Sequence, residues 1–168
     1  MQRFAQRGTP GTTETGLWGE RIAAEHLVAG GYSIMGRRVR PGHRDEIDII
    51  ARKGRVLAFV EVKTRLSEAF GRPAMAVDKA KRRNLCRAAA AYLRRAHYPD
   101  FVYRFDIVEV VGHPGMSEQP VVRHVADAFR FPERYRFSRR GQAAQAPGPW
   151  RRFLSFFVRL AHSLKPGG

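Results

Sequence analysis

Residues 48–63 read Asp48-Ile-Ile-Ala-Arg-Lys-Gly-Arg-Val-Leu-Ala-Phe-Val-Glu-Val-Lys63. Two apolar runs flank a turn around Lys53-Gly54, a pattern typical of a β-hairpin. Asp48 stands on the first run, and Glu61 and Lys63 stand on the second. An unpaired charge in a core strand costs several kcal/mol or shifts its pKa, so something must compensate these groups. A bound divalent metal is one candidate.

The pairing of the two strands can be predicted from the turn. If Lys53-Gly54 is a two-residue turn, Arg52 pairs with Arg55, and Asp48 lies opposite Phe59. Glu61 is then the diagonal neighbour of Asp48 on the same face, roughly 7–8 Å away between Cα atoms. Two carboxylates at that spacing can share one cation.

This hairpin supports two interpretations. In the first, Asp48 and Glu61 hold Mg²⁺ or Mn²⁺, and Lys63 orients a metal-bound water or stabilises charge that develops on phosphorus. In the second, the hairpin lies at the edge of a sheet and its charges face solvent. The sequence leaves both open.

Two further ionisable residues fall on apolar stripes of predicted helices. Glu20 lies on the stripe of the helix predicted over 17–29, and Lys81 lies on the stripe of the helix predicted over 77–96. A carboxylate and an amine on buried helix faces suggest a shared polar site. The alternative is a plain Glu20–Lys81 ion pair, or side chains that snorkel to solvent near the helix ends.

Short motifs along the chain occur in the order found in one bacterial family. They are Gly19-Glu20 with Ala23-Ala24 and Leu27, Gly31-Tyr32, Glu46–Ala51, Phe59–Arg65, Gly71, Pro73, Lys81, Arg104-Phe105-Asp106 and Ala128-Phe129. On these residues the chain resembles the UPF0102 (YraN) family over about residues 16–131. That family is similar to the restriction-endonuclease-like PD-(D/E)xK nucleases and to archaeal Holliday-junction resolvases.

The resemblance implies roles for four residues. Asp48, Glu61 and Lys63 match the Asp, the acidic residue and the Lys of the nuclease motif, and Glu20 matches the helical Glu that often completes the metal site. The implied metal ligands are therefore Asp48, Glu61 and Glu20. One position departs from the family, because Asp45 stands where a Gly is usual and adds negative charge near the path of a phosphate.

Composition favours a nucleic-acid partner. The chain has 31 Lys and Arg against 15 Asp and Glu, a net charge of +16. Such an excess suits a polyanion, because each phosphate contact releases counterions. An Arg-rich composition without function, or non-specific adhesion, is the alternative. The predicted nucleic-acid-binding residues are Arg37, Arg38, Arg40, Arg65, Lys81 and Arg82.

The order of predicted elements is that of an α/β chain, and the resemblance implies the restriction-endonuclease-like arrangement, a central mixed β-sheet flanked by helices. Besides the two helices, strands are predicted over 32–39, 46–51, 56–63, 102–111 and 121–126. In the strand over 102–111, Asp106 either supports the metal site or forms a structural ion pair. Cys86 is the single cysteine, and it is expected to pack in the core.

The chain divides into four predicted segments. Residues 1–15 form a disordered arm, 16–137 the nuclease-like domain, 138–149 a linker and 150–165 a basic amphipathic helix. That helix is too short to span a bilayer. It would contact a membrane surface, nucleic acid or a partner protein, or else pack on its own domain or on a second copy.

Two functions remain open from the sequence. The first is a Mg²⁺-dependent endonuclease acting on branched or structured DNA, with Glu20, Asp48, Glu61 and Lys63 as catalytic residues. The second is a non-catalytic nucleic-acid-binding protein that retains the nuclease fold. A homodimer is compatible with symmetric cutting of two strands. No signal-peptide core precedes the domain, so a cytoplasmic location is expected.

Overall fold

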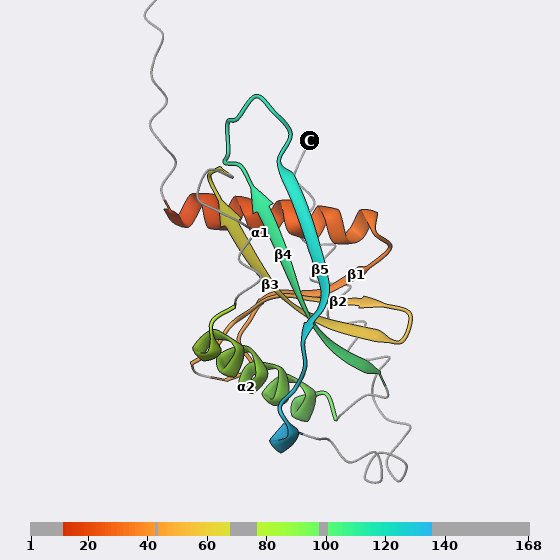
Figure 1. Cartoon of the computed structure of the whole chain (residues 1–168). Coiled ribbons are helices and arrows are strands. Elements are labelled where there is room, and N and C mark those ends of the chain that lie inside the picture. The colour runs from red at the N-terminus through yellow and green to blue at the C-terminus, as the bar shows by residue number, and fades with distance from the viewer. Residues whose placement is uncertain (1–11, 43, 68–76, 98–100, 136–168) are drawn as a thin grey trace, which may run out of the picture.

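A five-stranded mixed sheet forms the centre of the computed structural model, which describes residues 12–42, 44–67, 77–97 and 101–135 (Figure 1). The strand order is β1-β2-β3-β4-β5, the same as the chain order. The bounds are α1 (Thr12–Ala29), β1 (Ser33–Val39), β2 (Ile47–Lys53), β3 (Val56–Arg65), α2 (Lys79–Arg95), β4 (Val102–Val111) and β5 (Val121–Phe129), followed by a short 3₁₀ turn over Glu133–Tyr135.

The strands β3 and β4 are parallel, and the other neighbouring pairs are antiparallel. Parallel neighbours need a crossover connection, and α2 lies in that connection. Strand β3 is the central strand of the sheet, which agrees with its nearly continuous apolar sequence: Leu57 through Val60 are all buried. The predicted α/β class with a mixed sheet between helices is confirmed.

The two helices cover opposite faces of the sheet. Leu85 and Leu93 of α2 pack with Phe59 and Phe105, and we call this cluster the α2-side core. Leu27 of α1 belongs to the second cluster, the α1-side core, together with two pairs of strand residues: Ile49 and Val60, and Val108 and Val110. Along β3, successive side chains therefore point alternately to the face covered by α2 and to the face covered by α1.

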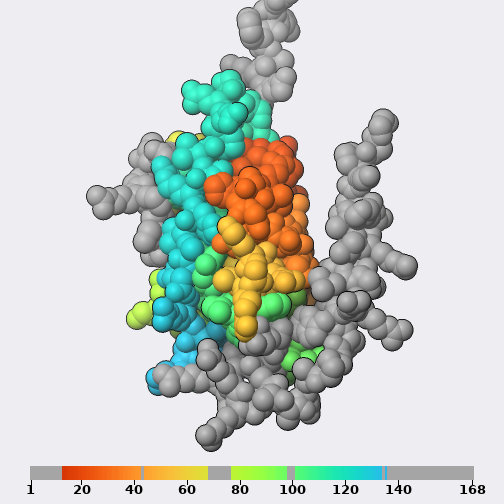
Figure 2. Space-filling model, turned by 90° about the vertical axis from the view of Figure 1, so that its right-hand side faces the viewer, coloured from red at the N-terminus to blue at the C-terminus, as the bar shows by residue number. Residues whose placement is uncertain are grey.

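The surface view shows α1 and β5 side by side, with the tip of the β2–β3 hairpin next to them (Figure 2). Helix α1 contacts β3 more extensively than any other strand, although β3 lies in the middle of the sheet. The helix thus runs across the sheet and reaches the strand that carries Glu61.

Most element boundaries differ little from prediction, but α1 begins at Thr12 and not at Leu17. The sequence predicts residues 12–15 to belong to a disordered arm, because the segment 1–15 is rich in Gly and Thr. Thr15 is buried, so packing against the sheet outweighs the weak helix propensity of this turn. The linker at 138–149 and the helix at 150–165 lie outside the described residues.

Among the described residues, no helix is long and apolar enough to cross a membrane. Cys86 is buried in the α2-side core, as predicted.

Candidate active site

The register of the β2–β3 hairpin brings Asp48 and Glu61 together more directly than predicted. The turn residues are Gly54 and Arg55, so Lys53 pairs with Val56 and Ile49 pairs with Val60. Continuing this register by one residue places Asp48 opposite Glu61. The predicted pairing of Asp48 with Phe59 is wrong because Gly54, with φ of +56°, occupies the first central position of the turn. A positive φ there suits the hairpin turns that match strand twist.

Both carboxylates lie on the face of the sheet that α2 covers. Phe59 on β3 belongs to the α2-side core, and Glu61 is two residues further along the same strand. The side chain of Glu61 is 2% exposed. The alternative of an edge hairpin with solvated charges is therefore wrong, since β3 is central and Glu61 is buried.

Two lysines neutralise Glu61. Lys63 Nζ lies 2.9 Å from Glu61 Oε1, and Lys81 Nζ lies 3.0 Å from Oε2. Lys81 comes from the first turns of α2, whose start is capped by the Asp78 carboxylate accepting from the Lys81 N–H. Burial by itself would lower the pKa of Lys81, but the charge of Glu61 and its hydrogen bond raise it above the usual value. Lys81 is thus a charged member of this site.

Asp48 is held at its carboxylate by the backbone of the opposite strand. The Val62 N–H donates to Asp48 Oδ2 over 2.7 Å. Burial and the negative charge of Glu61 nevertheless raise the pKa of Asp48 to about 6. The folded protein therefore pays for ionising Asp48 when no further cation lies beside it.

Gly19 explains how Glu20 reaches this site from α1. A Cβ on Gly19 would lie on top of Thr64 Oγ1, so only glycine permits this close approach of α1 to β3. Glu20 is 13% exposed, and its partner is Arg38, with Nη1 3.9 Å from Oε1. Burial raises the pKa of Glu20, while Arg38 and Arg37 oppose that shift. The alternative of a Glu20–Lys81 ion pair is wrong, because Lys81 contacts Glu61.

The residues partly fit a divalent cation. Every candidate ligand is a carboxylate oxygen, which Mg²⁺ and Mn²⁺ favour. Glu20 Oε2 and Glu61 Oε2 are both buried; among the described residues the first has no hydrogen-bond partner, and the second has Lys81 Nζ as its neighbour at 3.0 Å. Within the described part of the chain, no group of three or more His, Cys, Asp or Glu is close enough to hold a metal as the side chains stand. Asp48 and Glu61 are neighbours on adjacent strands, and Glu20 on α1 lies further from each of them.

The basic residues predicted to bind nucleic acid divide into two groups. Arg38 and Lys81 contact the acidic residues of the site, and Arg65 on β3 pairs with the buried Glu109. The other three residues lie on α2, on β1 and just after β1. Arg82 donates to Val77 O and stacks on Phe129, Arg40 pairs with Glu46, and Arg37 is exposed on β1.

Asp45 is neutralised by a residue that sequence reasoning missed. Arg87 of α2 donates to both carboxylate oxygens of Asp45, with Nε···Oδ2 of 2.6 Å and Nη2···Oδ1 of 2.7 Å. This fork ties the segment before β2 to α2. The compensating charge comes from 42 residues away in sequence.

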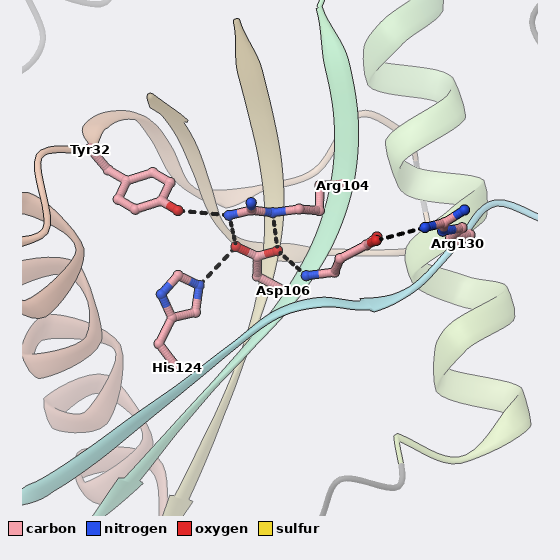
Figure 3. A network of polar contacts seen from close by, with 6 residues as sticks. Tyr32, Arg104, Asp106, His124 and Arg130 are labelled. Atoms are coloured by element: carbon pink, nitrogen blue, oxygen red, sulfur yellow. Dashed lines mark hydrogen bonds and ion pairs between the residues drawn. The ribbon is translucent and has the colours of Figure 1, made fainter. Parts of the chain in front are cut away.

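Asp106 is structural and lies on the opposite face of the sheet. It pairs in register with Val60 of the α1-side core, so its side chain points away from Glu61. Asp106 accepts from Arg104, His124 and the Asp127 N–H (Figure 3). Burial would raise its pKa, but the hydrogen bonds from His124 and Arg104 lower it below the usual value. Of the two predicted roles, the structure supports the ion pair.

Other proteins resemble this chain in sequence over the same region. A family model described as "Uncharacterised protein family UPF0102" matches residues 19–110. A UPF0102 protein of Chlorobaculum tepidum is 49% identical over 118 residues, covering 68% of this chain and 90% of the relative. A UPF0102 protein of Symbiobacterium thermophilum is 47% identical over 111 residues, covering 66% of this chain and 92% of the relative. The matched region contains every residue of the hairpin site.

Proposed function

The chain belongs to the UPF0102 family, and we propose that it is a metal-dependent endonuclease that hydrolyses phosphodiester bonds in branched or otherwise structured DNA. One observation carries the proposal. Asp48 and Glu61 come from adjacent antiparallel strands and share one face, and Glu61 is buried beside two lysines while Asp48 is half-buried. A binding surface needs exposed cations, whereas two adjacent carboxylates withdrawn from solvent need neighbouring cations to be stable when both are ionised.

The proposed site assigns a task to each residue. Asp48 and Glu61 would hold the Mg²⁺ or Mn²⁺, and Glu20 would approach it from α1. Such an ion supplies a Lewis acid and a bound water of lowered pKa. Lys63 and Lys81, which are partly exposed beside Glu61, would face the scissile phosphate and stabilise the charge that develops on its oxygens.

A second candidate function also has a specific observation in its favour. Lys63 and Lys81 already neutralise Glu61, and the acidic side chains of the described segments form no group of three around a common point. A protein of this fold that only binds nucleic acid would keep such closed ion pairs. In that case Asp48 and Glu61 stabilise the hairpin through their hydrogen bond and ion pairs and have no catalytic role.

Cleavage of labelled DNA substrates tests the proposal. Four-way junctions, flaps and linear duplexes are incubated with the full chain and Mg²⁺ or Mn²⁺. We expect cleavage of the branched substrates, and its loss by at least a hundredfold in Asp48→Asn and in Glu61→Gln, since removing one catalytic electrostatic group costs roughly 10²–10³ in rate.

The matched control is Glu25→Gln, which makes the same chemical change at an exposed carboxylate paired with Arg21 on α1. It should cut like the unmodified chain. Absence of cleavage in all variants, with DNA binding intact, would establish the second candidate function.

A further inference from the structure

A second buried glutamate lies beside the hairpin site on the same face of the sheet. We propose that Glu109 holds Arg65 and Arg123 in place as a binding site for a backbone phosphate of the nucleic-acid substrate, away from the bond that is cut. This inference rests on the proposed function for the identity of the ligand. Neither Glu109 nor Arg123 was singled out in the sequence.

Strand pairing places this cluster next to Lys63. Lys63 of β3 pairs with Glu109 of β4, and Glu109 pairs with Arg123 of β5. These three residues form a row across three strands and point to one face. Because Glu61 and Lys63 alternate onto that same face, the row continues the active site towards β5.

The contacts show an acid anchoring two cations. Arg65 Nε lies 3.2 Å from Glu109 Oε1, and Arg123 Nη1 lies 3.2 Å from Oε2. Glu109 is 6% exposed, whereas Arg65 is 29% and Arg123 is 40% exposed. The carboxylate is therefore beneath the surface, and the two guanidinium groups are partly open to solvent.

The Arg104–Asp106 pair shows what a purely structural arrangement looks like in this fold. Arg104 gives two nitrogens to Asp106 and one of them also to the Tyr32 hydroxyl, and it is 20% exposed (Figure 3). Asp106 is matched there by Arg104 and by His124, which is 16% exposed. Glu109 instead holds arginines from two different strands, and both of these are more exposed to solvent than Arg104 and His124.

The spacing predicts which phosphate would bind. Lys63 and Arg123 are two strands apart, which is about 10 Å at the usual distance between neighbouring strands. Successive nucleotides of one strand rise roughly 3.4 Å each along the axis of a DNA duplex. With the row of residues parallel to that axis, Arg123 would contact a phosphate about three nucleotides from the bond held at Lys63.

Binding in salt tests this site independently of cleavage. All variants carry Asp48→Asn, so that DNA stays intact, and affinity for a fluorescent branched DNA is measured across a salt series. Glu109→Gln with Arg123→Gln removes one charge of each sign, leaving the net charge unchanged and no buried charge unpaired. We expect the slope of log affinity against log salt to fall by about one, as for a lost phosphate contact.

Two further variants complete the test. Glu109→Gln with Arg65→Gln is a second charge-neutral pair, which should show the same loss if the first pair does not fold. Arg95→Gln removes a charge in the last turn of α2, about 20 Å along the helix from Lys81, and should leave the slope within a few tenths of the starting value.

The outcomes separate this inference from the endonuclease proposal. A reduced slope in the charge-neutral pairs without any cleavage by the full chain would keep the phosphate site and remove the nuclease activity. Cleavage by the full chain, with slopes equal to that of Arg95→Gln, would keep the nuclease and overturn the phosphate site. Duplexes that end within about two nucleotides of the cut on the bound side should also become insensitive to Arg123.

Discussion

At the scale of single residues, the site is defined by how buried acids are compensated. Glu61 has two lysines, whereas Asp48 has one backbone N–H and a negative neighbour. The charge of Asp48 is therefore costly in the folded chain, as its raised pKa indicates. A cation bound as we propose would relieve that cost.

Replacing Asp48 with Asn should stabilise the fold above pH 6. Asn keeps an oxygen to accept the Val62 N–H and removes the costly charge. Because the folded pKa of about 6 exceeds the ordinary value of 3.8, the penalty appears as pH rises between these values and is complete above them. We expect a gain of about 1–3 kcal/mol in unfolding free energy at pH 8, measured by urea denaturation.

The same comparison at pH 4 should give almost no difference, because Asp48 is then protonated in the folded chain. An equal gain at both pH values would show that the charge of Asp48 is not the cause. A loss of stability at pH 8 would instead identify Asp48 as a structural ion-pair partner.

At the scale of elements, the approach of α1 to β3 is set by one glycine. Gly19→Ala should destabilise the fold by about 1–3 kcal/mol, because the added methyl overlaps Thr64 and pushes the helix away. The rate of DNA cleavage should fall by more than this loss of stability explains, because moving α1 also displaces Glu20, the next residue along the helix. Thermal unfolding and the junction-cleavage assay measure the two effects.

Gly16 provides the control for that prediction within the same helix. A Cβ on Gly16 meets nothing within 4 Å, so Gly16→Ala should stabilise α1 by up to about 1 kcal/mol through helix propensity. Adding Thr64→Ala to Gly19→Ala should recover part of the loss. Identical behaviour of the two glycine variants would contradict the close approach.

The end of β5 depends on the Asp106 network. The β4–β5 register shifts between Phe105 and Ile107, and the Asp127 N–H there, with φ of +52°, donates to Asp106. Asp106→Asn should cost about 1–3 kcal/mol, because the half-buried Arg104 loses its charge partner and the buried hydrogen bonds around Asp106 are weakened. Urea denaturation measures this loss. The lowered pKa of Asp106 predicts that the contribution persists at neutral pH and disappears as pH falls below its ordinary value of 3.8.

Since this network faces away from Glu61, the rate of DNA cleavage by the folded Asp106→Asn protein should stay close to that of the unmodified chain. A selective loss of activity with unchanged stability would place Asp106 in the active site after all.

At the scale of the whole molecule, metal binding should be visible as stability. A ligand that binds only the folded chain stabilises it by about 1.4 kcal/mol at ten times its dissociation constant, which raises Tm by roughly 3–6 °C for a domain of this size. We expect this shift with Mg²⁺ or Mn²⁺ in differential scanning fluorimetry. Glu61→Gln should abolish it, and Glu25→Gln should retain it.

Calorimetric titration of the same ions provides the second readout, because heat that disappears in Glu61→Gln assigns the ion to the hairpin. Equal shifts of Tm in both variants would indicate that the ions bind elsewhere.

Local pattern was enough to predict much of this protein. Hydrophobic periodicity predicted both helices and all five strands of the described residues, because the apolar side chains of a half-buried helix or strand recur with the period of that element. The face shared by Asp48 and Glu61 was also predictable, since the alternation of side chains along a strand has period two. The family could be recognised from the same short motifs.

Only the tertiary structure decided which charges meet. The turn lies one residue later in the chain than predicted, because Gly54 begins it. Each residue of β2 therefore pairs two residues further along β3, and Asp48 lies opposite Glu61 instead of Phe59. Arg87 pairs with Asp45, and Arg123 pairs with Glu109, and in both cases the two residues come from segments that are well separated in the sequence. A sequence fixes the charge of each side chain locally, but the compensation of a buried charge depends on distances that exist only after the helices and strands have packed together.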